Sequence, residues 1–205
     1  MAAFKVTYFL TFAGSRGEEI CLALRIAGQA FDDDRLDREA FQKLKPELPF
    51  GSVPVLEVEG HGVLCQTNAI LRLIGRLYDL YPEEPFEAAR HDALMDAVED
   101  LRHKISPTQR MTDAAAKKAA RQQLAEAYIP QWGRGVERLI GKGPFVGGER
   151  PGVADIKLYM ADRWISSGVI DDLPKELFDP CPRLKAVARG IASHPAVQAW
   201  YAKVS

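Results

Sequence analysis

The sequence predicts two domains of different fold class: an α/β domain over residues 1–80 and an all-α domain over residues 87–205, joined by a linker at 81–86. Three observations predict this division. Strand and helix signals alternate from Phe4 to about residue 79. A break containing two prolines, at residues 81–85, then interrupts the alternation. Beyond that break the apolar residues recur at helical spacing only.

The first elements are predicted to be a strand, a helix and a second strand. Residues 4–9 (FKVTYF) are typical of a strand. Residues 16–27 predict a helix with two glutamates in its first turn and Gly28 as its stop. Residues 31–36 predict the second strand. A crossover of this length suits a right-handed parallel βαβ unit.

A hairpin and a helix complete the first domain. Residues 55–58 and 63–65 predict two short strands around a turn. Apolar residues then recur at Ile70, Ile74, Leu77 and Tyr81, which predicts a helix with Thr67 as its N-cap. With one more helix before the hairpin, the order β-α-β-(α)-β-β-α is that of a thioredoxin-like domain.

The second domain is predicted to be a helical bundle. Its first helix carries apolar residues at 94, 98, 101 and 105, and a long alanine-rich helix follows from about 113 to 140, with a kink at Pro130. Glycine-rich residues 141–148 form a break, and further helices are expected at 153–167, 183–192 and 196–203. Gly152 stands at the cap of the first of these, and Asp155 can bond back to its N–H.

Composition excludes several classes of partner. The chain has 27 Lys and Arg against 28 Asp and Glu, so no basic field for nucleic acid or an anionic membrane is indicated. No apolar run approaches the ~20 residues of a membrane span, and the first residues lack the features of a signal peptide. Three scattered cysteines predict no disulfide framework. We expect a cytoplasmic protein.

The segment Ser52-Val53-Pro54 predicts a ligand site. Proline belongs at the first residue of a strand, and the residue before it is extended. A cis bond at Pro54 would leave the backbone groups of Val53 free to pair with an extended ligand, as though with one more strand. The helix start at Gln66-Thr67 would offer free N–H groups to a carboxylate about a dozen residues later.

These residues resemble the glutathione transferase family, and its sigma-like cytosolic branch in particular. That branch carries an LPFG-hydrophobe-P-hydrophobe-LE-V-G run followed by Gln-Ser at a helix start; this chain has LPFGSVPVLEVEG at 48–60 and then Gln66-Thr67. The resemblance covers nearly the whole chain. It implies a homodimeric enzyme that conjugates reduced glutathione, its co-substrate, to small hydrophobic electrophiles. Glutathione-dependent peroxidase or isomerase activity, or glutathione binding without turnover, are the alternatives.

The resemblance assigns Tyr8 as the residue that donates its O–H to the glutathione sulfur, steadied by Arg16. From composition alone, a half-buried strand tyrosine is the ordinary interpretation. This chain departs from the sigma-like pattern because Arg16-Gly17 follows Tyr8 by eight residues instead of about four. The longer loop brings Ser15 to the first helix N-cap, where it is either the alternative donor or a plain cap.

The resemblance also supplies the residues that bind glutathione. Phe41 and Lys45 match positions that hold the glycine end, although Phe41 lacks the indole N–H of the family's tryptophan. Ser52, Val53 and Pro54 would face the cysteinyl part, and Gln66 and Thr67 the γ-glutamyl carboxylate. Asp96, or less favourably Asp100, would reach a partner subunit's γ-glutamyl amine; a solvated acidic stripe is the alternative. The electrophile is expected near Phe12, Met111 and Trp164, and no metal is expected.

Overall fold

The computed structural model describes residues 3–10 and 14–204. A four-stranded sheet in the order β2-β1-β3-β4 forms the centre of the first domain. Strand β1 (Phe4–Phe9) pairs in parallel with β2 (Asp32–Leu36) and antiparallel with β3 (Val55–Val58), which in turn pairs with β4 (Gly62–Cys65). The predicted parallel pair and the hairpin are confirmed, and the domain is thioredoxin-like.

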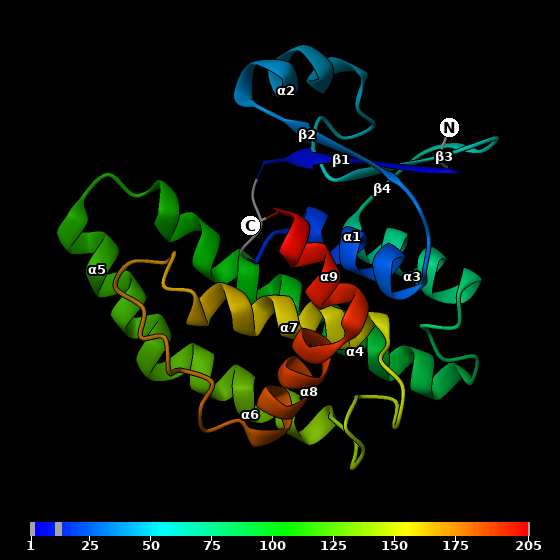
Figure 1. Ribbon diagram of the computed structural model, residues 1–205. Coiled ribbons are helices and arrows are strands. Elements are labelled where there is room, and N and C mark those ends of the chain that lie inside the picture. Colours follow the sequence, from blue (N-terminus) through cyan, green and yellow to red (C-terminus); the bar gives the residue numbers. More distant parts are fainter. Residues whose placement is uncertain (1–2, 11–13, 205) are drawn as a thin grey trace.

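Helices cover both faces of this sheet (Figure 1). Helix α2 (Arg38–Leu44) lies on one face, and α1 (Arg16–Ile26) and α3 (Thr67–Leu77) lie on the other, between the sheet and the helical domain. Because α1 is enclosed on both sides, its residues from Gly17 to Leu24 are all buried. The two glutamates predicted for its first turn, Glu18 and Glu19, are therefore buried as well.

The second domain consists of helices. They are α4 (Pro85–Ile105), α5 (Ala114–Gln123), α6 (Ile129–Leu139), α7 (Val153–Ser166), α8 (Pro182–Ser193) and α9 (Pro195–Val204). The 3₁₀ turns η1 (Lys45–Glu47) and η2 (Ser106–Arg110) follow α2 and α4. Helix α7 lies at the centre and is buried over most of its length, and α9 returns beside α1 (Figure 1). One continuous apolar core therefore joins both domains.

The structure differs from the sequence prediction most at three places. Helix α3 ends at Leu77, because Asp79 adopts a positive φ of 59°, and Tyr81 is buried from the segment that follows. Pro85 and Phe86, inside the predicted linker, form the first turn of α4. Ahead of Pro130 the helical path widens into a π turn, η3 (Leu124–Tyr128), which relieves the clash of the proline ring with the preceding turn.

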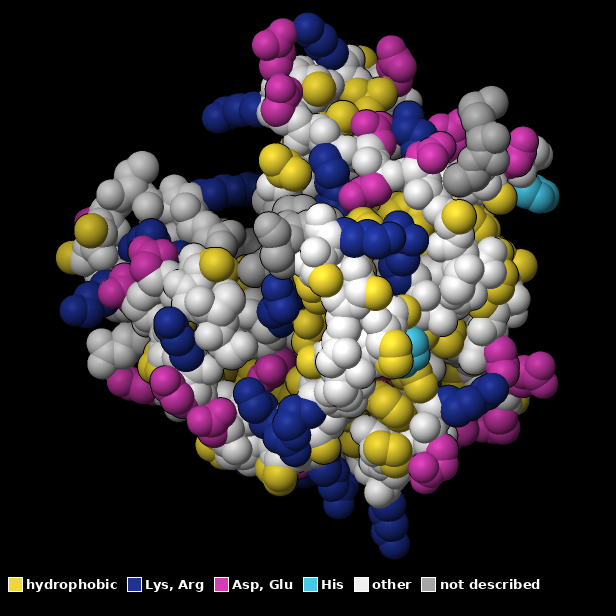
Figure 2. Space-filling model, viewed as in Figure 1, with side chains coloured by type: hydrophobic (Ala, Val, Ile, Leu, Met, Phe, Trp, Pro, Cys, Tyr) yellow, Lys and Arg dark blue, Asp and Glu magenta, His cyan; other side chains and the backbone are white. Residues whose placement is uncertain are grey.

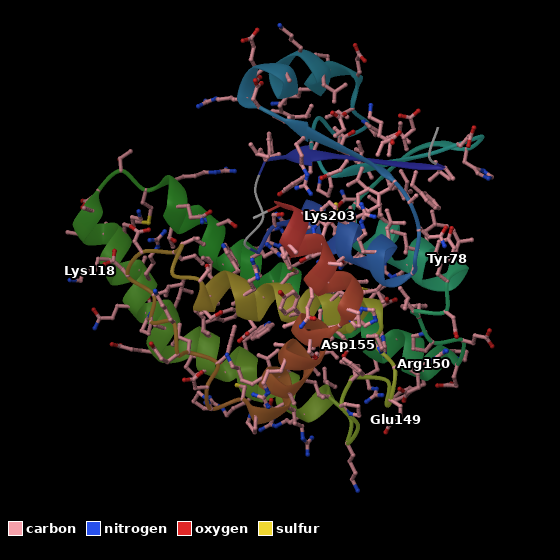
Figure 3. The ribbon with its side chains drawn as sticks, viewed as in Figure 1. Tyr78, Lys118, Glu149, Arg150, Asp155 and Lys203 are labelled. Atoms are coloured by element: carbon pink, nitrogen blue, oxygen red, sulfur yellow. The ribbon has the colours of Figure 1, made fainter. Side chains whose placement is uncertain are left out.

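Asp155 fixes the start of α7. Its carboxylate accepts the N–H of Gly152 and the N–H of Val146, each at 2.8 Å. Figure 3 shows Asp155 at the end of α7 next to the loop that carries Glu149 and Arg150. Burial raises the pKa of Asp155 to about 6, against the opposing effect of the two N–H donors. The side chain thus ties the glycine-rich loop to the core.

The surface carries mixed charge. Figure 2 shows basic and acidic side chains interspersed over the face in view. Within the described residues, no helix is both long and apolar enough to cross a membrane. All three cysteines are free; Cys21 and Cys181 are buried, whereas Cys65 is half-buried at the end of β4.

Candidate active site

The peptide group of Val53 is available at the end of the sheet. The Val53–Pro54 bond is cis, the isomer on which the expected pairing with a ligand depends, and Pro54 is buried directly before β3. The ladder between β1 and β3 ends at the pair Thr7 and Val55. Among the described residues, neither the N–H nor the C=O of Val53 has a hydrogen-bond partner within the protein. An extended ligand can therefore pair with it.

The start of α3 provides free backbone donors beside this peptide. The N-cap is Gln66 and not Thr67, which corrects the prediction, because Gln66 takes φ 69° and Thr67 is the first helical residue. A non-glycine residue with positive φ is uncommon and occurs often at functional sites. Among described residues no side chain caps this helix. Its first N–H groups remain free for an anion.

These two features face one cavity of about 450 Å³ between the domains. It brings together seven residues that the sequence singled out: Arg16, Ser52, Val53, Pro54, Gln66, Thr67 and Asp96. It adds five that the sequence did not: Asn68, Ala69, Arg72, Glu99 and His103. The cavity has the charged and hydrogen-bonding lining that suits a peptide-like ligand with carboxylates and an amine.

Contacts between α3 and α4 organise one wall of the cavity. Asn68 donates from Nδ2 to Oδ1 of Asp96 at 2.7 Å, and Arg72 donates from Nε to Oδ1 of Asp92 at 2.7 Å. Two members of the acidic stripe on α4 therefore have partners within the chain. The i, i+4 spacing of the aspartates in the sequence indicated that they share one face of a helix. Nothing in the sequence indicated that α3 would lie against that face.

Tyr8 is not among the residues that line this cavity. Its ring packs on the first turn of α1, where a methyl group placed on Gly17 would lie 2.4 Å from Cγ of Tyr8. It also contacts Phe9, with ring centroids 5.4 Å apart. Burial raises the pKa of Tyr8, and the charges of Arg16 and Arg102 offset this only in part. The phenol therefore keeps its proton at neutral pH and can donate it.

Arg16 and Ser15 are both engaged by the protein. The guanidinium of Arg16 donates from Nε and Nη2 to Oε2 of Glu99 at 2.9 and 2.7 Å. Burial alone would raise the pKa of Glu99, but Lys157 and Arg16 reverse the shift and lower it to about 2. Ser15 is buried as the N-cap of α1, and its hydroxyl accepts the N–H of Glu18 at 3.3 Å. The cap role predicted for Ser15 is confirmed.

The remaining predicted residues lie around the cavity. Phe41 is half-buried against Phe9, with ring centroids 4.8 Å apart, and Lys45 is exposed with its side chain over Gly51. Met111 is partly exposed after η2. Trp164 is buried in α7 against Gly14. Phe12 lies outside the described residues.

Comparison with known proteins identifies the family. Residues 4–76 match the family model for the glutathione S-transferase N-terminal domain, and residues 99–204 match the model for the C-terminal domain. The chain belongs to the glutathione S-transferase family. The predicted sigma-like branch is not tested by these matches and stays a prediction.

Relatives of this transferase carry two kinds of name. Hematopoietic prostaglandin D synthase of Gallus gallus is 30% identical over 199 residues, 96% of each chain. Glutathione S-transferase 1 of Ascaris suum is 36% identical over 130 residues, which are 63% of this chain and only 62% of that relative. The solved structure of prostaglandin synthase D of Nilaparvata lugens covers 98% of both chains with a TM-score of 0.86 and 27% identity.

Proposed function

We propose that this transferase conjugates reduced glutathione to small hydrophobic electrophiles, using Tyr8 to stabilise the glutathione thiolate. One observation carries the proposal: the free peptide group of Val53 and the uncapped N-terminus of α3 face the same cavity. Glutathione needs both, because its cysteinyl backbone is an extended peptide and its γ-glutamyl end is a carboxylate.

The residues present can hold each part of glutathione. Val53 pairs through its backbone with the cysteinyl unit, and Gln66 and Thr67 bind the γ-glutamyl carboxylate. Asp96, whose side chain is 65% exposed, receives a γ-glutamyl amine, and the resemblance assigns that amine to a partner subunit. Lys45 pairs with the glycine carboxylate beside Phe41. The proposal places the sulfur next to Arg16, which lines the cavity, and within reach of the Tyr8 hydroxyl.

The chemistry depends on the protonation state of the sulfur. A free thiol has a pKa of about 8.5, so a neutral solution holds mainly the unreactive form. A hydrogen bond from the Tyr8 hydroxyl favours the thiolate and lowers that pKa. The proton leaves to solvent, and the sulfur lone pair then forms the C–S bond as the leaving group departs with its electron pair. Positioning and charge stabilisation supply the catalysis, which favours broad specificity.

A homodimer in the cytoplasm is part of this proposal. Phe50 and Phe86 are 68% and 75% exposed, and a dimer interface that covers them would remove their apolar surface from water. A solution mass of twice 22.7 kDa by light scattering is expected; a mass of one chain would contradict the dimer.

A second candidate function is glutathione-dependent isomerisation at the same site. It is favoured by the prostaglandin D synthase names of relatives that match nearly the full chain. The thiolate would then add to the substrate and leave again, with no net consumption of glutathione. Glutathione-dependent peroxide reduction uses the same residues.

The test compares wild type, Tyr8→Phe and Ser15→Ala with a chlorodinitrobenzene substrate. We expect Tyr8→Phe to lower the rate about 10²-fold or more, as loss of one preorganised donor does. Ser15→Ala should lose stability through the cap and keep its chemistry. Loss of activity confined to Ser15→Ala would overturn the assignment. Retention on a glutathione column with no turnover of an electrophile, prostaglandin endoperoxide or peroxide would indicate a binding module instead.

A further inference from the structure

We propose that a buried charge cluster between the domains stabilises the thiolate form of bound glutathione. This interdomain charge cluster consists of Arg16, Glu19, Glu99, Arg102 and Lys157. Arg16 and Glu99 touch the cavity, whereas Glu19, Arg102 and Lys157 are positioning residues that act through them. The inference deepens the proposed transferase function and rests on it.

Three helices, α1, α4 and α7, meet in the cluster. Glu19 of α1 binds two cations, since Arg102 Nη2 donates to its Oε1 at 2.6 Å and Lys157 Nζ lies 3.1 Å from its Oε2. Lys157 of α7 also donates to Oε1 of Glu99 in α4. Glu99 uses its other oxygen for Arg16 at the start of α1. The bonds therefore form a continuous chain from the cavity wall to the core of the helical domain.

The cluster is removed from water. The side chains of Glu19 and Lys157 are fully buried and that of Arg102 is 5% exposed, while Glu99 and Arg16 at the cavity are 22% and 32% exposed. The charges of Glu19, Arg102 and Lys157 are therefore little screened by solvent or salt. Lysine and glutamate are almost never fully buried unless they are paired. The two carboxylates of the cluster can neutralise two cations, but the cluster contains three cations.

The excess charge is the central observation. Arg16, Arg102 and Lys157 contribute three positive charges against the two negative charges of Glu19 and Glu99. One positive charge is therefore uncompensated within the cluster. An opposite charge placed beside such a group is favoured, and a thiolate in the cavity would supply it.

The cluster is bonded to the segment that carries the residues proposed to act on the sulfur. Arg102 donates from Nη1 to the carbonyl of Gly14 at 2.6 Å, which anchors the chain just before Ser15 and Arg16. The ring of Tyr8 packs against the next residue, Gly17. The cluster thus fixes the helix turn that packs against the proposed donor, and Arg16 extends from that turn to the cavity.

Other charged groups also face the cavity. Arg72, Asp96 and His103 line it in addition to Arg16 and Glu99. Arg72 is paired with Asp92 at 2.7 Å, and Asp96 accepts from Asn68. These groups belong to the α3–α4 wall and are left unchanged by the variants below.

The test measures the pKa of glutathione bound to the protein, from the ultraviolet absorbance of the thiolate against pH. Lys157→Met lowers the cluster's net charge to zero, and Glu19→Gln raises it by one. The double variant restores the wild-type charge. We expect the thiol pKa to rise by about half to one unit in Lys157→Met and to fall by a similar amount in Glu19→Gln. In the double variant it should return to within a few tenths of a unit of the wild-type value.

If the cluster had only a structural role, the thiol pKa values of the three variants would follow a different order. Breaking either buried contact would then shift the thiol pKa in one direction, with the double variant worst, and that result would overturn the inference. Unchanged pKa values would do the same. Glu19→Gln and the double variant decide the matter if Lys157→Met fails to fold. Lys185→Met is the matched control, because it removes a lysine paired with Asp162 at 3.0 Å elsewhere in the helical domain. Absence of any thiolate signal in the wild type would overturn the proposed function itself.

Discussion

Replacing Gly17 with alanine should displace the Tyr8 side chain and lower the rate, although the Tyr8 hydroxyl itself is kept. The added methyl group would lie 2.4–2.6 Å from three atoms of the Tyr8 side chain, whereas ordinary contacts begin at 3.4 Å. The ring must therefore retreat by about 1 Å. A misplacement of this size at a catalytic group costs about 10²-fold in rate, which corresponds to about 2.7 kcal/mol of transition-state free energy. We expect that loss in kcat/KM, together with about 1–3 kcal/mol of stability from overpacking.

The assay is conjugation of chlorodinitrobenzene, run beside chemical denaturation to confirm that the variant is folded. Gly135→Ala is the matched control, because nothing lies within 4 Å of a methyl group at that position in α6. Alanine there should leave the rate unchanged and add about 0.5–1 kcal/mol of stability. A double variant with Tyr8→Phe should lose no more activity than Tyr8→Phe alone. Full activity in Gly17→Ala, or an undiminished further loss in the double variant, would refute the reasoning.

Three further predictions concern stability. The pKa of Glu99 is lowered to about 2 from 4.5, so its ionisation contributes about 3 kcal/mol to the free energy of unfolding above pH 4.5, and this contribution is lost as pH falls through 2. Urea titrations should therefore show that wild type loses about 2 kcal/mol more than Glu99→Gln between pH 6 and pH 3. Equal losses in the two proteins would contradict the lowered pKa. Asp155→Ala removes an acceptor from the N–H groups of Val146 and Gly152 and should cost about 2–4 kcal/mol in the same assay, whereas a loss below about 1 kcal/mol would mean that water replaces it. Gly152→Ser would supply a cap hydroxyl, but its Cβ would lie 2.9 Å from the carbonyl oxygen of Leu80. We therefore expect the free energy of unfolding to fall by about 1 kcal/mol, and a rise would contradict this prediction.

Elements with a strong local signal were predictable. The strands around the hairpin and the start of α1 after Ser15 follow from residue types within a few positions of each other. Boundaries that depend on a single strained residue were not. Helix α3 stops at Leu77 although its apolar spacing continues to Tyr81, because Asp79 leaves the helical conformation and Tyr81 packs from outside the helix.

By itself the sequence determined which segments form strands and helices, and where backbone groups would be left free for a ligand, because side-chain period, proline and capping residues act over a few neighbours. Only the tertiary structure decided that Glu19 and Lys157 meet in the core, and that Gly17 closes on Tyr8. In the sequence alone, Glu19 and Lys157 look like ordinary charged residues on a solvated helix face. Their burial follows from α1 lying between the sheet and α7, and contacts between elements distant in the chain are not encoded in local periodicity.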